Sequence, residues 1–262
     1  MQKRHQNRKL YFEEQDYTTR RYVIPFIEQH QPLYPGMRIL EIGCGDGGNL
    51  KPFLERGCQV TGVDLSENKI DLARRFFADD PDRDQLALIC DDIYNLEPAG
   101  HRFDLILMRD VIEHIHNQER FMAFVKRFLS RQGLFLLVFP PWQNPFGGHQ
   151  QVCQNRLLSH LPYFHLLPTS CYRFVLKTGG ESRATIDGLL EIKETGISIE
   201  RFESILKKEN YRLLRKTLYL VNPNYEIKFG LKPRKQAAWM VRLPGVRNFF
   251  TTTAYYLIDF PE

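Results

Sequence analysis

Short blocks of apolar residues, which predict strands, recur along the first half of the chain. In the longer segments between them, apolar residues recur with the spacing of a helix. Ile70, Ala73 and Phe77 mark the apolar face of one such helix. The last block is continuously apolar, which is typical of a parallel strand covered on both faces. Strands that alternate with helices predict an α/β fold with a doubly wound, mostly parallel sheet. The predicted strands lie at residues 39–42, 59–64, 86–90, 103–108 and 134–139.

The alternation stops after residue 139. Residues 140–196 are rich in proline, aromatic residues and histidine, and the next clear helix begins only after Ser198. A segment of this length inside a compact domain is usually a functional lid or a small helical insert. Because it follows the carboxyl end of the fifth strand, we predict a lid-like insert that selects the substrate. Beyond it the pattern predicts strands at 211–221 and 249–258.

Residues 1–36 predict a helix at 10–30 and a loop with Pro32, Pro35 and Gly36. We expect this N-terminal segment to be a helical cover over the sheet. No internal repeat or low-complexity tract divides the chain. The whole of 1–262 is therefore predicted to be a single domain, with the cover and the insert at 140–196 as its additions.

The pattern at residues 38–50 predicts a strand, a tight turn and a helix, and this stretch contains four glycines within six residues. A backbone without Cβ atoms at Gly43 and Gly45 can adopt positive φ and lie directly against a flat ligand. Open α/β sheets bind ligands at this carboxyl edge. Gly43, Gly45 and Gly48 also satisfy the dinucleotide fingerprint G-x-G-x-x-G, so a nicotinamide cofactor remains an alternative at this point.

Acidic residues around this turn favour S-adenosylmethionine over a nicotinamide cofactor. Glu41 precedes the first glycine by two positions, where it would attract the ammonium group of a zwitterion and repel a pyrophosphate. Asp64 ends the second strand about twenty residues further on, where a carboxylate can accept hydrogen bonds from a ribose diol. Asp91 and Asp92 end the third strand and suit an adenine amino group.

In this order and spacing, the segments resemble the class I S-adenosylmethionine-dependent methyltransferases, in particular the broad small-molecule subgroup with Glu-x-Gly-x-Gly and Val-x-Glu-His motifs. The motifs here are residues 41–45 and 111–114, and the resemblance covers residues 11–140. It implies a Rossmann-like sheet of seven strands whose last strand is antiparallel. It also implies methyl transfer from S-adenosylmethionine, with S-adenosylhomocysteine as the product.

The resemblance implies a set of cofactor-binding residues, which we name by the part of the cofactor that each would contact. They are Glu41, Gly43, Cys44 and Gly45 at the methionine moiety, Tyr17 or Arg21 at its carboxylate, Arg109 through its carbonyl near the sulfonium, Asp64 at the ribose, Leu65 at the adenine face, and Asp91 or Asp92 at the adenine amino group with Ile93 beneath.

The catalytic residues are harder to predict than the cofactor-binding residues. Alignment of the nucleophile and the methyl group can lower the reaction barrier by roughly 7–11 kcal/mol, so the reaction does not require a base in a fixed sequence pattern. We predict His149 as a general base, with Asp110 as the second candidate; the alternative for His149 is a histidine that only shapes its loop. His114 is interpreted as a structural contact. No His, Cys or Asp cluster has metal-ligand spacing in the sequence, so no metal is expected.

Composition and charge indicate the cellular location and the possible partners. No stretch is long and apolar enough to suggest a membrane span, the basic N-terminus lacks an apolar signal core, and the five cysteines show no paired spacing, so we expect a cytoplasmic protein. The net charge of +5 is concentrated in residues 207–247, which carry eleven Lys and Arg against two Glu. That region is either an ordinary solvated face or a docking surface for an anionic partner.

The leading hypothesis is a methyltransferase that acts on oxygen of a small-molecule, lipid or sugar acceptor. Two alternatives stay open. The first is a methyltransferase that docks RNA or protein through residues 207–247, although no aromatic-interleaved nucleic-acid pattern accompanies the charge. The second is a non-catalytic protein that binds S-adenosylmethionine.

Overall fold

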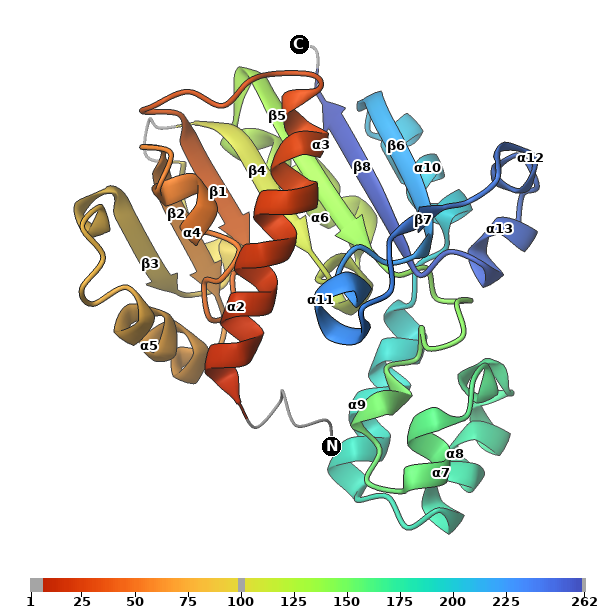
Figure 1. Ribbon diagram of the computed structural model, residues 1–262. Helices are drawn as coiled ribbons and strands as arrows, with labels where there is room; N and C mark the ends of the chain where they lie inside the picture. Colours follow the sequence, from red (N-terminus) through yellow and green to blue (C-terminus); the bar gives the residue numbers. More distant parts are fainter. Residues whose placement is uncertain (1–6, 99–101, 261–262) are drawn as a thin grey trace.

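The computed structural model describes residues 7–98 and 102–260. In these residues one sheet of eight strands runs in the order β3-β2-β1-β4-β5-β8-β6-β7 (Figure 1). The first five strands are parallel, and β8 is antiparallel to both β5 and β6. The strands are β1 Arg38–Ile42, β2 Gln59–Asp64, β3 Leu86–Cys90, β4 Phe103–Arg109, β5 Leu129–Phe139, β6 Arg212–Val221, β7 Arg234–Lys235 and β8 Thr253–Asp259.

The doubly wound, mostly parallel sheet and the antiparallel last strand are confirmed. The predicted seven strands are joined by an eighth, the two-residue β7 at the sheet edge. The expected start of the last strand at Phe249 is wrong, because Val246–Phe249 forms the short helix α13 and β8 starts at Thr253.

Helices cover both faces of the sheet because each strand directs alternate side chains to opposite faces. In β5, Leu134, Leu136 and Val138 belong to one core, with α2 and α3, and the intervening apolar residues belong to the other, with α6 and α10. The helices of the two faces are α2 Arg8–Thr18, α3 Ile24–Glu28, α4 Lys51–Leu54, α5 Glu67–Phe76, α6 Gln118–Val125 and α10 Ile199–Lys208.

The predicted N-terminal helix is continuous from α2 to α3 through a π-helical turn, Thr19–Val23. It crosses the front of the sheet in Figure 1 and lies close to the carboxyl ends of the central strands. The short helix α11, Tyr225–Phe229, packs against α2. None of the described helices combines the length and apolar character that crossing a bilayer requires.

The insert is helical and has its own small core. Its helices are α7 Arg156–His160, α8 Thr169–Thr178 and α9 Arg183–Thr195, and they extend below the sheet in Figure 1. The two ends of the insert are joined where the backbone N–H of Trp142 donates to the carbonyl of Ile197 over 2.8 Å. Its apolar centre consists of Cys153, Leu158, Phe164, Tyr172, Leu176, Ile186, Leu189 and Leu190.

Candidate active site

The glycine turn after β1 leaves its backbone open on one side. The N–H groups of Gly43 and Cys44 donate to the carbonyl of Val63 over 2.8 and 3.0 Å, which fixes the turn to β2. Gly43 and Gly45 both have positive φ, 75° and 55°. A Cβ at Gly43 would lie 2.4 Å from Val111, whereas at Gly45 the nearest described atom is 4.0 Å away. A flat ligand can therefore reach the backbone at Gly45.

Asp64 stands at the end of β2 with its carboxylate directed at this turn. One of its oxygens accepts the N–H of Gly45 over 2.9 Å, and the other accepts the N–H of Ser66 over the same distance. The ammonium of Lys69 lies 3.7 Å from the first oxygen. Each carboxylate oxygen has a second lone pair. Asp64 is thus held rigidly and can still accept further hydrogen bonds.

A buried polar network lies beneath the turn. The Glu41 carboxylate is fully buried, and one oxygen accepts the amide N–H of Asn49 over 2.7 Å. The other oxygen has no hydrogen-bond partner in the described part of the chain. Burial raises the pKa of Glu41 to about 8. Arg109 donates to Asn49 and to Thr19, over 2.8 Å for the latter, and thereby connects β4 to the N-terminal cover.

Leu65 and the acidic pair after β3 lie at the expected adenine end. Leu65 is 74% exposed although it is apolar. Asp91 accepts the N–H of Asp92 over 2.7 Å, and Asp92 accepts the N–H of Tyr94 over 2.9 Å. Because both acids accept hydrogen bonds within the same turn, these contacts do not distinguish which of them would bind the adenine amino group. Ile93 is buried beneath.

Tyr17 and Arg21 point toward the carboxylate of Glu226 on α11. Tyr17 donates its hydroxyl over 3.2 Å, Arg21 donates its Nε over 3.0 Å, and Tyr22 contacts the same oxygen. Their assignment to a methionine carboxylate stays a prediction. The structure shows that the two side chains do converge on a carboxylate, but one that belongs to the protein.

Tyr11 is a residue of the site that the sequence did not single out. It lies on α2 and is half-buried. Burial raises the pKa of Tyr11 to about 12, and the negative charge of Asp110 adds to this effect. The charge of Asp110 therefore acts on the Tyr11 hydroxyl, which indicates that the two residues lie near each other. The only sequence signal was the recurrence of tyrosine along the predicted cover helix.

Two candidate bases approach the end of β4 from different segments. Asp110 follows β4 directly, has a φ of 55° and is exposed. Desolvation by the surrounding protein atoms raises the pKa of Asp110 although the residue remains accessible to solvent, and the charge of Arg109 opposes this shift. His149 has a φ of 53° and comes from the insert. Burial lowers the pKa of His149 to about 4, so its imidazole is neutral near pH 7.

His149 faces Glu113 and His114, the acidic and basic residues of the predicted Val-x-Glu-His motif. The His114 and His149 ring centres are 5.0 Å apart, and the His149 Nε2 lies 3.9 Å from a Glu113 oxygen. Within the described residues these three side chains form a cluster whose metal-binding atoms all lie within 4.8 Å of one another. The sequence shows no metal-ligand spacing here because the contact joins distant parts of the chain.

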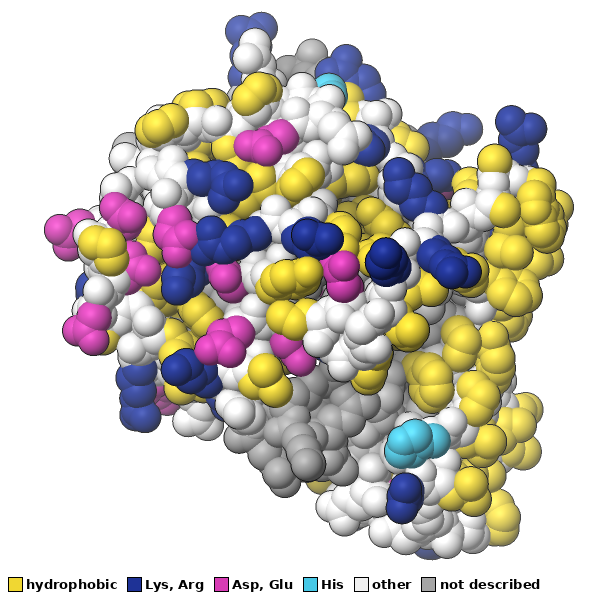
Figure 2. Space-filling model, viewed as in Figure 1, with side chains coloured by type: hydrophobic (Ala, Val, Ile, Leu, Met, Phe, Trp, Pro, Cys, Tyr) yellow, Lys and Arg dark blue, Asp and Glu magenta, His cyan; other side chains and the backbone are white. Residues whose placement is uncertain are grey.

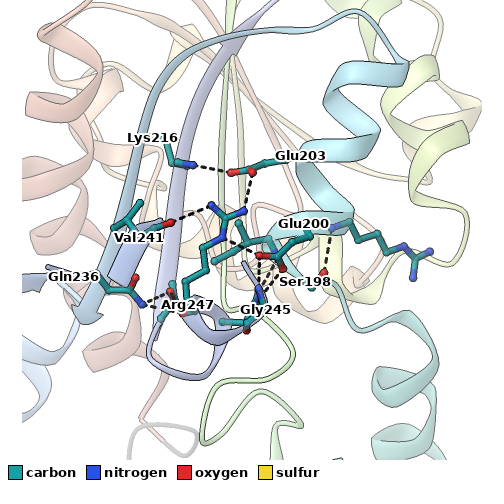
Figure 3. Close-up of polar contacts among 12 residues, drawn as sticks. Ser198, Glu200, Glu203, Lys216, Gln236, Val241, Gly245 and Arg247 are labelled. Atoms are coloured by element: carbon teal, nitrogen blue, oxygen red, sulfur yellow. Dashed lines mark hydrogen bonds and ion pairs between the residues drawn. The ribbon is translucent and has the colours of Figure 1, made fainter. Parts of the chain in front are cut away.

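Part of the basic region 207–247 is paired with acids from other elements. Arg247 donates to Glu200 and to Glu203, each over 2.8 Å, and Lys216 donates to Glu203 over 2.8 Å (Figure 3). Arg212 is paired with Asp259. Lys216 and Arg247 thus attach β6 and the β6–β8 connection to α10, which supports a structural role for these two members of the region.

Comparison with known proteins identifies the family. The family described as "Methyltransferase domain" matches residues 12–167, more than half of the chain. The chain belongs to this family. It is a class I S-adenosylmethionine-dependent methyltransferase, as the resemblance predicted.

Curated relatives of this methyltransferase are named for oxygen methylation. It is 37% identical over 105 residues to the ubiquinone biosynthesis O-methyltransferase of Mesorhizobium japonicum, covering 40% of this chain and 41% of the relative. It is 33% identical over 104 residues to the mitochondrial enzyme of that name from Arabidopsis thaliana, covering 40% of this chain and 32% of the relative. The match thus spans less than half of the length of these relatives.

Solved structures support the fold over nearly the whole methyltransferase. The plantazolicin methyltransferase BpumL in complex with SAH has a TM-score of 0.54 at 14% identity, covering 96% of this chain and 84% of the other. Phosphoethanolamine N-methyltransferase 2 of Haemonchus contortus, in complex with phosphomonomethylethanolamine and S-adenosylhomocysteine, has a TM-score of 0.55 at 18% identity, covering 91% and 52%. At these identities the likeness shows the fold alone.

Proposed function

We propose that this methyltransferase transfers the methyl group of S-adenosylmethionine to an oxygen of a small-molecule, lipid or sugar acceptor. The observation that carries the cofactor assignment is the pairing of Asp64 with the uncovered backbone at Gly45. The free oxygen of Glu41 lies under the same turn. Support for an oxygen acceptor comes from the curated relatives, which are named O-methyltransferases.

In the proposed complex the cofactor lies across the carboxyl edge of β1, β2 and β4. Asp64 accepts the two ribose hydroxyls, and the exposed Leu65 packs on the adenine, whose amino group donates to Asp91 or Asp92 with Ile93 beneath. Glu41 faces the ammonium group, the backbone of residues 43–45 lines the methionine moiety, and the carbonyl of Arg109 lies near the sulfonium. The methionine carboxylate is left for Tyr17 or Arg21.

The chemical step is an in-line displacement. A lone pair of the acceptor oxygen forms a bond to the methyl carbon while the carbon–sulfur bond breaks, and its electron pair goes to sulfur to give S-adenosylhomocysteine. The hydroxyl proton passes to a base or to water. Asp110 is better supported than His149 as that base, because it is exposed at the end of β4 and His149 is a weak base.

We assign acceptor selection to the insert. Its first turn brings His149 to the end of β4, and its helix α9 contacts the segment Ile112–His114. The insert therefore lies beside the place where the acceptor must align with the methyl group. Its outer helices α7 and α8 extend away from the sheet (Figure 1).

The test is transfer of a radiolabelled methyl group from S-adenosylmethionine to a panel of phenols, polyprenylated phenols, sugars, RNA and proteins. Labelling of a hydroxyl compound is expected, and Asp64→Ala should abolish it. Asp71→Ala is the matched control, because it removes an exposed acid of α5, outside the insert. Labelling of RNA or protein alone, or binding of S-adenosylhomocysteine without any transfer, would replace the proposal by one of the alternatives.

A further inference from the structure

Three side chains around the exit of β4 form a set of donors that the methyl transfer described above does not use. Glu113 and His114 belong to the turn Ile112–His114, and His149 reaches them from the insert. Their donor atoms all lie within 4.8 Å of one another. We propose that Glu113, His114 and His149 bind one divalent transition-metal ion.

Glu113 is the residue that most needs such an ion. It is 3% exposed, and neither of its carboxylate oxygens has a hydrogen-bond partner in the residues that the structure describes. The ring nitrogen Nε2 of His149 lies 3.9 Å from one of these oxygens, which is too long for a hydrogen bond. A buried carboxylate without a partner is costly, and coordination to a metal is one of the few ways to compensate it. One of its oxygens lies within 4.8 Å of a ring nitrogen of each imidazole.

A simple ion pair between Glu113 and His149 does not account for the arrangement. The His149 Nε2 stays 3.9 Å from a Glu113 oxygen, and both carboxylate oxygens are left without a hydrogen bond in the described part of the chain. An imidazole binds a metal through a nitrogen lone pair. The charged groups around the cluster are Asp110, whose negative charge acts on both Glu113 and His114, and Lys69 and Glu191, which act on His114.

The backbone on both sides of the cluster is fixed. The side chain of Gln118 donates to the carbonyl of Ile112 over 3.0 Å, and Thr195 donates to the carbonyl of Glu113. On the other side, a Cβ at Gly148 would lie 2.3 Å from His165, so only glycine allows the turn to pack here and to present His149. The cluster is therefore preorganised by two separate parts of the fold.

The donor set indicates the kind of ion. Two imidazoles and one carboxylate are ligands of Zn²⁺ and of related ions such as Co²⁺ and Fe²⁺, whereas Mg²⁺ and Ca²⁺ prefer oxygen. Ligand atoms about 2.1 Å from a tetrahedral ion lie roughly 3.4 Å apart, so the cluster must contract by about an ångström. His114 is exposed and can make this adjustment. Three protein ligands leave at least one coordination position open.

The open position suggests a role that rests on the proposed function. A hydroxyl of the acceptor that binds the ion would lose its proton more easily, because a bound cation stabilises the alkoxide or phenolate. Asp110 or water would take the proton. The oxygen would then attack the methyl carbon, and the electron pair of the carbon–sulfur bond would remain on sulfur. In this arrangement His149 holds the ion and is not the base.

The experiment is metal titration of tag-free, chelator-stripped protein. With Co²⁺ we expect one equivalent to bind and to produce the visible absorption of four- or five-coordinate cobalt, and with Zn²⁺ we expect calorimetric binding that displaces it. Glu113→Gln and His149→Asn should each weaken Co²⁺ binding by about a hundredfold or more. Asparagine is chosen because it tolerates the left-handed backbone at residue 149. Circular dichroism checks the fold of each variant.

His116→Ala is the matched control, since His116 is 64% exposed at its side chain, lies two residues from His114 and pairs with Glu191 outside the cluster. It should bind Co²⁺ like the parent protein. The inference is overturned if the parent binds neither ion, or if the folded Glu113→Gln and His149→Asn variants bind as tightly as the parent. Binding of S-adenosylhomocysteine, measured separately, distinguishes this failure from a failure of the proposed function.

Discussion

The cofactor edge at residues 38–65 and the insert at residues 140–196 meet at one site but are built differently. At the cofactor edge, polar groups are held by the turns that follow neighbouring strands, as Asp64 is by the N–H groups of Gly45 and Ser66. The insert has a separate core and reaches the site through His149 and α9. Cofactor binding therefore depends on local backbone geometry, whereas acceptor binding depends on how a second unit is placed against the sheet.

The two regions also differ in how completely they are packed. The central strands are buried on both faces, while the insert exposes Leu157 and Phe174, at 73% and 66%. Figure 2 shows apolar side chains gathered along the edge formed by α12, Ala238–Val241, by α13 and by the insert. A small core with exposed apolar neighbours opens at lower free energy than a central sheet. We therefore expect the acceptor side to be the more adaptable half of the site.

The largest effect is expected for Gly43→Ala. A Cβ there would lie 2.4 Å from Val111, and φ is 75°. Left-handed strain of about 1–2 kcal/mol and overpacking of about 1–3 kcal/mol should together lower the free energy of unfolding by roughly 2–5 kcal/mol. Denaturant unfolding measures this change.

Gly180→Ala in the insert is the matched control for that variant. Gly180 has a φ of 80°, but no described atom lies within 4 Å of the added Cβ. It should cost only the backbone strain of about 1–2 kcal/mol. Equal losses in the two variants would show that the close packing of Val111 on the glycine turn is unimportant.

The next effect in size is the loss of cofactor binding in Asp64→Ala. Hydrogen bonds to a charged group contribute about 1.5–3 kcal/mol, so removal of the carboxylate should weaken S-adenosylhomocysteine binding by roughly a hundredfold or more. Isothermal titration calorimetry gives the affinity. Asp71→Ala, which removes an exposed acid of α5, should leave it unchanged. Unaltered binding in Asp64→Ala would refute the whole assignment of the cofactor edge.

Much of the cofactor edge was predictable because its signals are local. The strand, the glycine turn and the acids Glu41 and Asp64 follow one another in the sequence, and parallel strands bring their carboxyl ends to one edge. The cluster of Glu113 and His149 was not predictable, because only the packing of the insert brings its members together. The pairing of Tyr17 with Glu226 depends on a similar long-range contact.

The wrongly predicted start of the last strand also has a physical cause. Phe249 and Phe250 are aromatic and are followed by three threonines, all residue types of high strand propensity, so the sequence predicted strand there. In the structure both side chains are partly exposed, at 37% and 43%, and Phe249 ends the helix α13. Apolar character alone does not distinguish a buried strand from an exposed helical turn.

A smaller effect is expected from pH, and it tests Glu41. Its pKa is raised to about 8 by burial, so the free protein holds a proton that an ionic contact with the cofactor ammonium would expel. Affinity for S-adenosylhomocysteine should therefore rise by up to about tenfold from roughly pH 6 to pH 7, with release of a proton. Calorimetry in buffers of different ionisation enthalpy detects that proton.

Glu41→Gln is the control for this pH dependence. Glutamine retains an oxygen for the hydrogen bond from Asn49 but has no proton to release. Its binding should be weaker and nearly independent of pH over the same range. A pH-independent affinity in the parent protein would mean that Glu41 supports the turn without contacting the ammonium group. The same raised pKa predicts that folding stability falls as pH rises from about 4.5 toward 8, since only the unfolded state is then ionised.

The smallest effect is expected in the insert, for Gly188→Ala. Gly188 lies inside α9, is exposed, and has no described atom within 4 Å of an added Cβ. Alanine in a helix interior is favoured over glycine by about 0.5–1 kcal/mol, so α9 should be stabilised by that amount. Hydrogen exchange of α9 measures the local change. If the insert opens separately from the sheet, protection should increase in α9 but not in β1; an equal increase in both would show that the two regions unfold as one unit.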